Sequence, residues 1–130
     1  MTVKLAIKGL DGFKRNLSNL AQLNGFDAEL ERSAQDIAAT AAQNLKQMGA
    51  EKPGGKLAAS LTVTSGDQEF SKIIGSGLKY AAFVEFGTLR TSPKPWLSSA
   101  LAAEKPAFKI RIGDLLRTTA TSNTGARNNP

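Results

Sequence analysis

The chain of 130 residues contains no cysteine and no histidine. The absence of cysteine excludes disulfide bonds and thiolate chemistry. The absence of histidine removes the commonest general base and the commonest ligand of transition metals, and it excludes a serine–histidine triad. Any catalysis would have to use carboxylates, lysines or hydroxyl groups. We therefore expect a protein that is not an enzyme and that needs no metal or cofactor.

The chain also lacks long apolar runs and has few aromatic residues. No stretch approaches the roughly 20 apolar residues of a membrane-spanning helix. Residues 1–8 alternate charge and apolarity, unlike the apolar centre of a signal peptide. These features predict a protein made and used in a cytoplasm, without a membrane partner. The aromatic residues are not interleaved with basic ones, so sequence-specific recognition of nucleic acid is not expected.

Charge is unevenly distributed along the chain, whose formal net charge is +6. Residues 88–130 hold seven basic and two acidic residues, whereas residues 1–87 hold ten basic and nine acidic ones. The basic third favours contact with an acidic partner, either nucleic acid or a protein surface. A solvated basic face explains the same pattern, and composition alone leaves these alternatives open. Non-specific contact with passing DNA stays among them.

Periodicity predicts a strand and two helices in the first 48 residues. Thr2–Lys8 alternates like a strand, and Asp11 can cap a short helix. The apolar stripe of that helix would be Leu10, Phe13, Leu17 and Leu20. Asn24-Gly25 is expected to break it before a longer helix from about Asp27 to Met48. The long helix carries apolar residues at steps of three and four, namely Leu30, Ala34, Ile37, Ala41, Leu45 and Met48.

Glycine and proline divide the middle of the chain. Gly49–Gly55 is expected to be a loop, and Lys56–Ser60 a single helical turn. Leu61–Ser65 and Phe70–Gly75 are predicted to be the two strands of a hairpin, whose loop can exceed two residues.

The remainder is predicted to hold two helices. Tyr80–Phe86 is predicted to be a two-turn helix, ended by Gly87 in the left-handed conformation. After a polar loop, Pro95 suits the first position of a helix that ends at about Leu116. Pro106 should kink or break this helix, and residues 106–113 also alternate like a strand, so both interpretations stay open.

These elements predict a single-domain α+β fold. A small antiparallel β-sheet would pack against one long helix and a C-terminal helix. The domain is expected to span residues 1–117. Residues 118–130 are polar and aperiodic, and are expected to form a flexible tail.

One carboxylate lies within an apolar predicted helix. Glu85 falls just before the helix-ending Gly87, and a buried carboxylate needs partners. Thr88, Arg90 and the N–H groups that follow Pro95 are expected to be within reach. Glu85 is therefore interpreted as a structural tie between two helix ends.

Two sequence blocks surround this carboxylate. Residues 80–88 read Tyr-Ala-Ala-Phe-Val-Glu-Phe-Gly-Thr, and residues 95–101 read Pro-Trp-Leu-Ser-Ser-Ala-Leu. Upstream, residues 55–61 read Gly-Lys-Leu-Ala-Ala-Ser-Leu, and residues 3–11 form a strand and turn. In this order the segments resemble the small head–tail joining, or tail-completion, family of long-tailed bacteriophages. The chain departs from the family pattern at Gly54, where threonine is usual, at Trp96, where phenylalanine is usual, and at Pro106, which falls within the last helix.

The resemblance implies a structural virion protein at the head–tail junction, assembled in the host cytoplasm. Such a protein completes the tail tube and joins it to the head connector as a homo-oligomeric, six-membered ring. The implied partners are the tail tube protein and the head connector or stopper protein. The matching residues would form a structural and assembly motif made of Tyr80, Glu85, Phe86, Gly87, Thr88, Pro95, Trp96 and Leu97.

Two other classes of function remain as alternatives. The first is a small basic protein that binds nucleic acid without sequence preference. The second, ranked last, is a hydrolase that uses carboxylates. Two measurements separate these hypotheses. A ring protein should assemble with itself or with a phage partner, whereas a nucleic-acid-binding protein should shift free duplex DNA at physiological salt.

Overall fold

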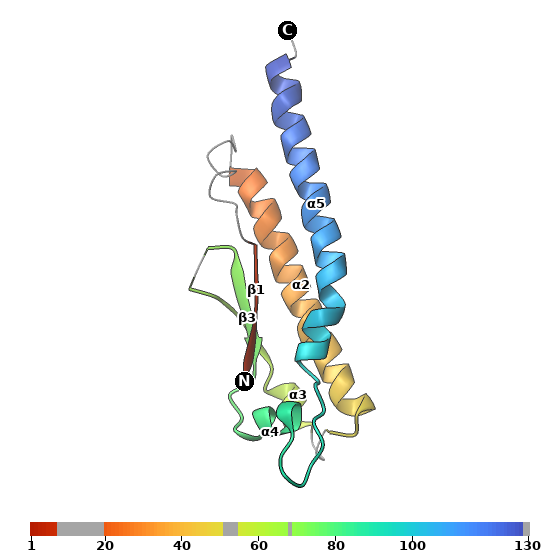
Figure 1. The fold of residues 1–130 in the computed structure, drawn as a ribbon. Helices are drawn as coiled ribbons and strands as arrows, with labels where there is room; N and C mark the ends of the chain where they lie inside the picture. The colour runs from red at the N-terminus through yellow and green to blue at the C-terminus, as the bar shows by residue number, and fades with distance from the viewer. Residues whose placement is uncertain (8–19, 51–54, 68, 129–130) are drawn as a thin grey trace.

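The computed structural model describes residues 1–7, 20–50, 55–67 and 69–128. These residues form a single α+β domain with a three-stranded antiparallel sheet. The long helices α2 (Leu20–Gln47) and α5 (Ser98–Asn128) lie side by side, and α2 contacts all three strands (Figure 1). The predicted fold class is therefore confirmed.

The sheet has the strand order β1-β3-β2, so the last strand in sequence lies in the middle. Its strands are β1 (Thr2–Ala6), β2 (Thr62–Ser65) and β3 (Ser71–Gly75). Strands β2 and β3 pair antiparallel, which confirms the predicted hairpin. Strand β1 confirms the predicted N-terminal strand and pairs with the other edge of β3, with Thr2 opposite Gly75.

Helix α2 carries the core of the domain on one stripe. The predicted stripe is confirmed, because five of its residues are fully buried, namely Leu30, Ala34, Ile37, Ala41 and Leu45. The predicted break at Asn24-Gly25 is wrong, since α2 begins at Leu20 and runs through both residues. Glycine costs about 1 kcal/mol inside a helix. Packing offsets that cost here, because Phe26 is fully buried and Gly25 faces Leu115 of α5. The short helix expected after Asp11 lies outside the described residues.

Two short helices complete the fold. Helix α3 (Lys56–Ala59) confirms the predicted helical turn, and α4 (Tyr80–Phe86) has the predicted bounds. None of the described helices combines the length and apolar character needed to cross a bilayer.

Residues 106–113, for which helix and strand were both possible from the sequence, are helical and belong to α5. It begins at Ser98, after a turn at Trp96-Leu97, rather than directly after Pro95. Pro106 lies inside the helix with its ring exposed, so one backbone hydrogen bond is missing there. Burial of Phe108 and Ile112 just beyond it holds the helix against the rest of the domain.

The predicted end of α5 near Leu116 is wrong, because the helix continues to Asn128. No apolar stripe marks this extension in the sequence. Adding residues to an existing helix is far easier than starting one, so a helix can continue through residues that carry no apolar stripe. The division into a domain of residues 1–117 and a flexible tail of residues 118–130 stays a prediction.

A polar cluster joins α2 to α5. Arg111 donates to Glu29 at 3.0 Å and to Glu104 at 2.6 Å, and it also donates to the Ser33 hydroxyl. Ser33 is fully buried and donates to Glu104 at 3.2 Å. The hydrogen bond to Glu104 is the main cause that raises the pKa of Arg111 above its ordinary value. The cluster fixes which residues of the two helices face each other.

We expect Arg111→Met to lower the free energy of unfolding by about 2 kcal/mol, because Glu29 and Glu104 would lose their shared cation. This value allows for the partial exposure of the three side chains, which weakens their attraction. Urea unfolding measures the change. Arg117→Met is the matched control, since its pair with Asp114 is exposed and worth less than about 1 kcal/mol. Equal losses in both variants would contradict a special role for the cluster.

Candidate functional site

The predicted tie between two helix ends is present. Glu85 lies on α4 and is 3% exposed. Its two carboxylate oxygens accept hydrogen bonds from the backbone N–H groups of Leu97, at 3.0 Å, and Ser98, at 3.1 Å. These N–H groups lie at the start of α5, where no carbonyl of the same helix can reach them. The negative charge also complements the positive end of the helix dipole.

The donors to Glu85 are those predicted near Pro95, whereas Thr88 and Arg90 bond elsewhere. The Thr88 side-chain oxygen accepts from the backbone N–H groups of Arg90, at 3.2 Å, and Thr91, at 3.1 Å. Both oxygens of Glu85 are thus engaged by the backbone, an arrangement that suits a helix cap rather than a proton donor or acceptor.

Trp96 anchors the junction between α4 and the start of α5, here called the α4–α5 corner, to the rest of the domain. Its side chain is fully buried, and its indole N–H donates to the carbonyl of Ala81 on α4 at 3.3 Å. The side-chain amide of Asn44 on α2 donates to the carbonyl of Trp96 and to the Ser99 hydroxyl, both at 3.1 Å. The neighbouring Leu97 is also fully buried. Three helices therefore meet at this corner.

Gly87 ends α4, but not in the conformation that the sequence predicts. Its φ of 77° is positive as predicted, whereas its ψ of 177° is extended rather than left-handed helical. This region of backbone space is essentially restricted to glycine. A Cβ atom here would lie 2.7 Å from the carbonyl oxygen of Thr91 and 2.8 Å from the nitrogen of Pro93. The chain therefore needs glycine at this position for two separate reasons.

The loop after Gly87 is closed by its own backbone. The N–H of Thr88 donates to Thr91 at 2.8 Å, and the N–H of Thr91 donates back at 3.3 Å. Further on, the N–H of Lys94 donates to the carbonyl of Val84 on α4 at 2.8 Å. The loop is thus tied down at its tip and where it returns to the helix.

The eight predicted motif residues divide by burial. Glu85, Trp96 and Leu97 are buried, Tyr80 and Gly87 are half-buried, and Phe86, Thr88 and Pro95 are exposed. They lie on α4, at the start of α5 and in the loop between these helices, and the hydrogen bonds made by Leu97 and Trp96 join the two ends of this segment. Figure 1 shows α4 beside the start of α5.

Sequence reasoning missed a surface at this corner. Phe83 and Phe86 are 59% and 70% exposed, and Leu89 at the loop tip is fully exposed. The spacing of three residues could have placed the two phenylalanines on one helix face, opposite Ala81 and Glu85.

The segment of residues 55–61 has a structural role. Gly55 precedes α3 with φ of 65°, and Leu57 is fully buried. Ser60 donates to the carbonyl of Leu57 at 2.6 Å, and its hydroxyl lies 2.6 Å from that of Ser76, just after β3. The segment therefore fastens α3 to the end of the sheet.

Over the described ranges, no three His, Cys, Asp or Glu side chains gather as metal ligands. The chemistry that this corner supports is packing and backbone hydrogen bonding, with apolar side chains directed into solvent.

Comparison with known proteins identifies the family. The family described as "Bacteriophage HK97-gp10, putative tail-component" matches residues 11–87. The match extends through α4 to Gly87 and includes Glu85. No curated protein and no solved structure matches the chain. Because the match covers more than half of the sequence, the chain belongs to the HK97-gp10-like family of bacteriophage tail components.

Proposed function

We propose that the protein completes the tail tube and joins it to the head connector as a homo-oligomeric, six-membered ring. It acts as a structural protein rather than an enzyme, at the head–tail junction of the virion, after assembly in the host cytoplasm. Its partners are the tail tube protein and the head connector or stopper protein. Membership of a phage tail family supports this role.

The observation that carries the proposal is the construction of the α4–α5 corner. Glu85 and Gly87 hold α4 and the loop that follows it, and Phe83 and Phe86 on the helix and Leu89 in the loop are exposed to solvent. Exposed apolar side chains gathered in one place mark surfaces that contact other proteins. A corner that is fixed by hydrogen bonds and carries exposed apolar side chains suits a subunit that must fit between neighbours.

The alternative, a basic protein that binds nucleic acid without sequence preference, has less support. Arg111 binds two carboxylates inside the domain, and Arg117 is paired with Asp114. Two of the basic residues in the C-terminal third are therefore already engaged by carboxylates of the same chain.

Deletion of the gene tests the proposal. We expect the lysate to contain filled heads and separate tails, because the ring would no longer join them. Electron microscopy counts the three kinds of particle, and a plasmid copy of the wild-type gene should restore intact phage. Intact particles at the normal level from the deletion strain would overturn the proposed function. A shift of free duplex DNA at physiological salt by the purified protein would favour the alternative.

A further inference from the structure

We propose that the end of the molecule formed by α3, α4 and the loop after α4 binds an acidic, partly apolar surface of another virion protein. The inference rests on the proposed function for the identity of that protein, and it adds the chemistry by which the two surfaces recognise each other. Five basic residues define this end, which is called the basic end: Lys46, Lys56, Lys79, Arg90 and Lys94.

Hydrogen bonds bring the end of α2 to the loop after α4. Lys46 is in the last turn of α2, two residues after Asn44. The side chain of Asn44 donates to the carbonyl of Trp96 at 3.1 Å. Lys94, two residues before Trp96, donates its N–H to the carbonyl of Val84 on α4 at 2.8 Å. Lys46 and Lys94 are therefore on segments that meet at the same place.

Helix α3 lies beside the chain that leads into α4. The hydroxyls of Ser60, at the end of α3, and Ser76 are hydrogen-bonded at 2.6 Å. Lys56 begins α3, and Lys79 follows Ser76 by three residues. Arg90 lies in the loop that connects α4 to α5. Figure 1 shows α3, α4 and this loop together at one end of the molecule, next to the last turn of α2.

The basic end carries positive charge without exposed negative charge. Four of its five basic residues are exposed and Lys94 is half-buried, and none forms an ion pair with a residue that the structure describes. Within residues 37–50, 55–66 and 70–103, Glu85 is the only carboxylate, and it is buried against backbone N–H groups. The exposed carboxylates are on other parts of the fold: Asp27, Asp36, Asp67, Glu69 and Asp114. Such a field attracts an acidic partner.

Apolar side chains are exposed among these cations. Lys79 precedes α4 but already has helical backbone angles, with φ of −62° and ψ of −37°. Steps of four and three residues therefore place Lys79, Phe83 and Phe86 on one side of the helix. Both phenylalanines are more than half exposed, and Leu89 and Arg90 are exposed neighbours in the loop that follows. A partner has to cover apolar surface and to neutralise cations at the same time.

A protein surface meets both requirements. Protein interfaces combine an apolar centre with a polar rim, and complementary charges guide the encounter. Duplex DNA would supply phosphates for the cations, but interfaces with DNA are more polar and would leave the phenylalanines uncovered. Attachment to a membrane strengthens with the apolar area inserted, and α4 offers only two phenylalanines over seven residues. Carboxylates around an apolar patch of a protein are the chemistry that fits.

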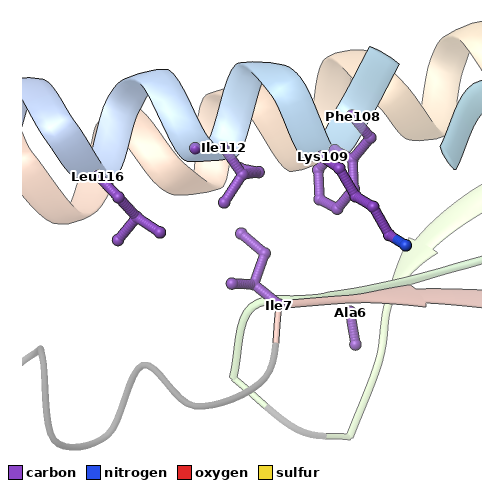
Figure 2. A pocket seen from close by; sticks show the side chains of 7 residues that line it. Ala6, Ile7, Phe108, Lys109, Ile112 and Leu116 are labelled. Atoms are coloured by element: carbon purple, nitrogen blue, oxygen red, sulfur yellow. The ribbon is translucent and has the colours of Figure 1, made fainter. Parts of the chain in front are cut away.

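Zero-length cross-linking tests the contact in tails and intact particles. A carbodiimide joins a lysine amine to a carboxylate only where the two groups touch, and mass spectrometry then identifies both residues. We expect Lys79 and Lys94 to be joined to aspartate or glutamate residues of one other virion protein. Lys105 and Lys109 are matched controls, since both are exposed on α5 away from the basic end, and they should react far less often. Figure 2 shows Lys109 beside an apolar pocket between the end of β1 and α5, and it is roughly 16 Å along the helix from Ser98.

Neutralised variants measure what the charges contribute. The test variant changes three basic residues around α4: Lys79→Gln, Arg90→Gln and Lys94→Gln. The matched control changes three exposed basic residues elsewhere and lowers the net charge equally: Arg32→Gln, Lys105→Gln and Lys109→Gln. In the complemented deletion strain, we expect the test variant to join heads to tails at least about tenfold less often than the parent, and the control to match the parent. Phe83→Ser with Phe86→Ser should show a similar loss, because it removes the apolar part of the contact.

A test variant that melts and joins heads to tails like the parent would overturn the proposal. If the variant melts lower, the cross-links decide. Control lysines that react as often as Lys79, or bonds from Lys79 to other copies of this chain, would also overturn it. So would binding of the parent, but not of the test variant, to duplex DNA or to phosphatidylserine vesicles at physiological salt. Intact particles from the deletion strain would overturn the proposed function alone, because cross-linking still reports what the basic end contacts.

Discussion

Replacing Glu85 with alanine is expected to lower the free energy of unfolding by about 3 kcal/mol. The change leaves the buried N–H group of Leu97 and the N–H group of Ser98 without their acceptor. An unsatisfied buried donor costs about 1–3 kcal/mol. For a chain of this size the loss corresponds to a fall of about 10 °C in Tm. Calorimetry measures the fall, and the same sample tested for self-assembly should show fewer oligomers, because α4 is no longer held to the start of α5.

Two companion variants separate the causes of this effect. Glu85→Gln keeps one acceptor oxygen and the shape of the side chain, so its loss should be about half as large. Asp36→Ala removes an exposed carboxylate from α2 and should change Tm little. A Glu85→Ala protein that melts and assembles like the parent would mean that the two hydrogen bonds contribute nothing.

Replacing Gly87 with alanine is expected to lower the free energy of unfolding at least as much as Glu85→Ala does, by about 3 kcal/mol or more. The backbone conformation is strained for any residue with a Cβ, which costs about 1–3 kcal/mol. In addition, the new Cβ would collide with backbone atoms of Thr91 and Pro93, so the loop would have to move. Urea unfolding measures the cost.

Gly49 provides a control for a positive φ without a collision. It also has a positive φ, of 65°, but no atom lies within 4 Å of a Cβ built there. Gly49→Ala should therefore cost only about 1 kcal/mol, which is the price of the left-handed conformation. If the two alanine variants proved equally stable, the collision inferred at Gly87 would be wrong.

The sequence predicts the elements of this domain better than their ends. Helix α4 and the β2–β3 hairpin were predictable because glycine, proline and polar turns bound them. The start of α2 was not, because Asn24-Gly25 is a local breaking signal, whereas burial of Phe26 is a tertiary effect. Pro106 misleads in the same way, since packing of Phe108 and Ile112 maintains the helix beyond it.

The hydrogen bonds of the candidate site were predictable from the sequence, but its exposed apolar surface was predictable only in part. A carboxylate within an apolar helix requires donors, which identified Glu85 and the N–H groups after Pro95. The backbone conformation of Gly87 depends on how the loop returns to α4 through the hydrogen bond from Lys94 to Val84. Local sequence does not encode this contact. The spacing of Phe83 and Phe86 indicates that they share one face of α4, but which face the rest of the domain covers is a tertiary effect that local sequence does not encode.

The strand order has a consequence for the way in which the chain is made. Strand β1 pairs with β3 from Thr2 opposite Gly75 to Ala6 opposite Ser71, a separation of more than 60 residues. Translation proceeds from the N-terminus, so β1 leaves the ribosome well before its partner exists. Helix α2, whose backbone bonds are local, is synthesised in between and is available to form first. The hairpin of β2 and β3 then offers β1 its open edge, and the sheet closes only after more than half of the chain has emerged.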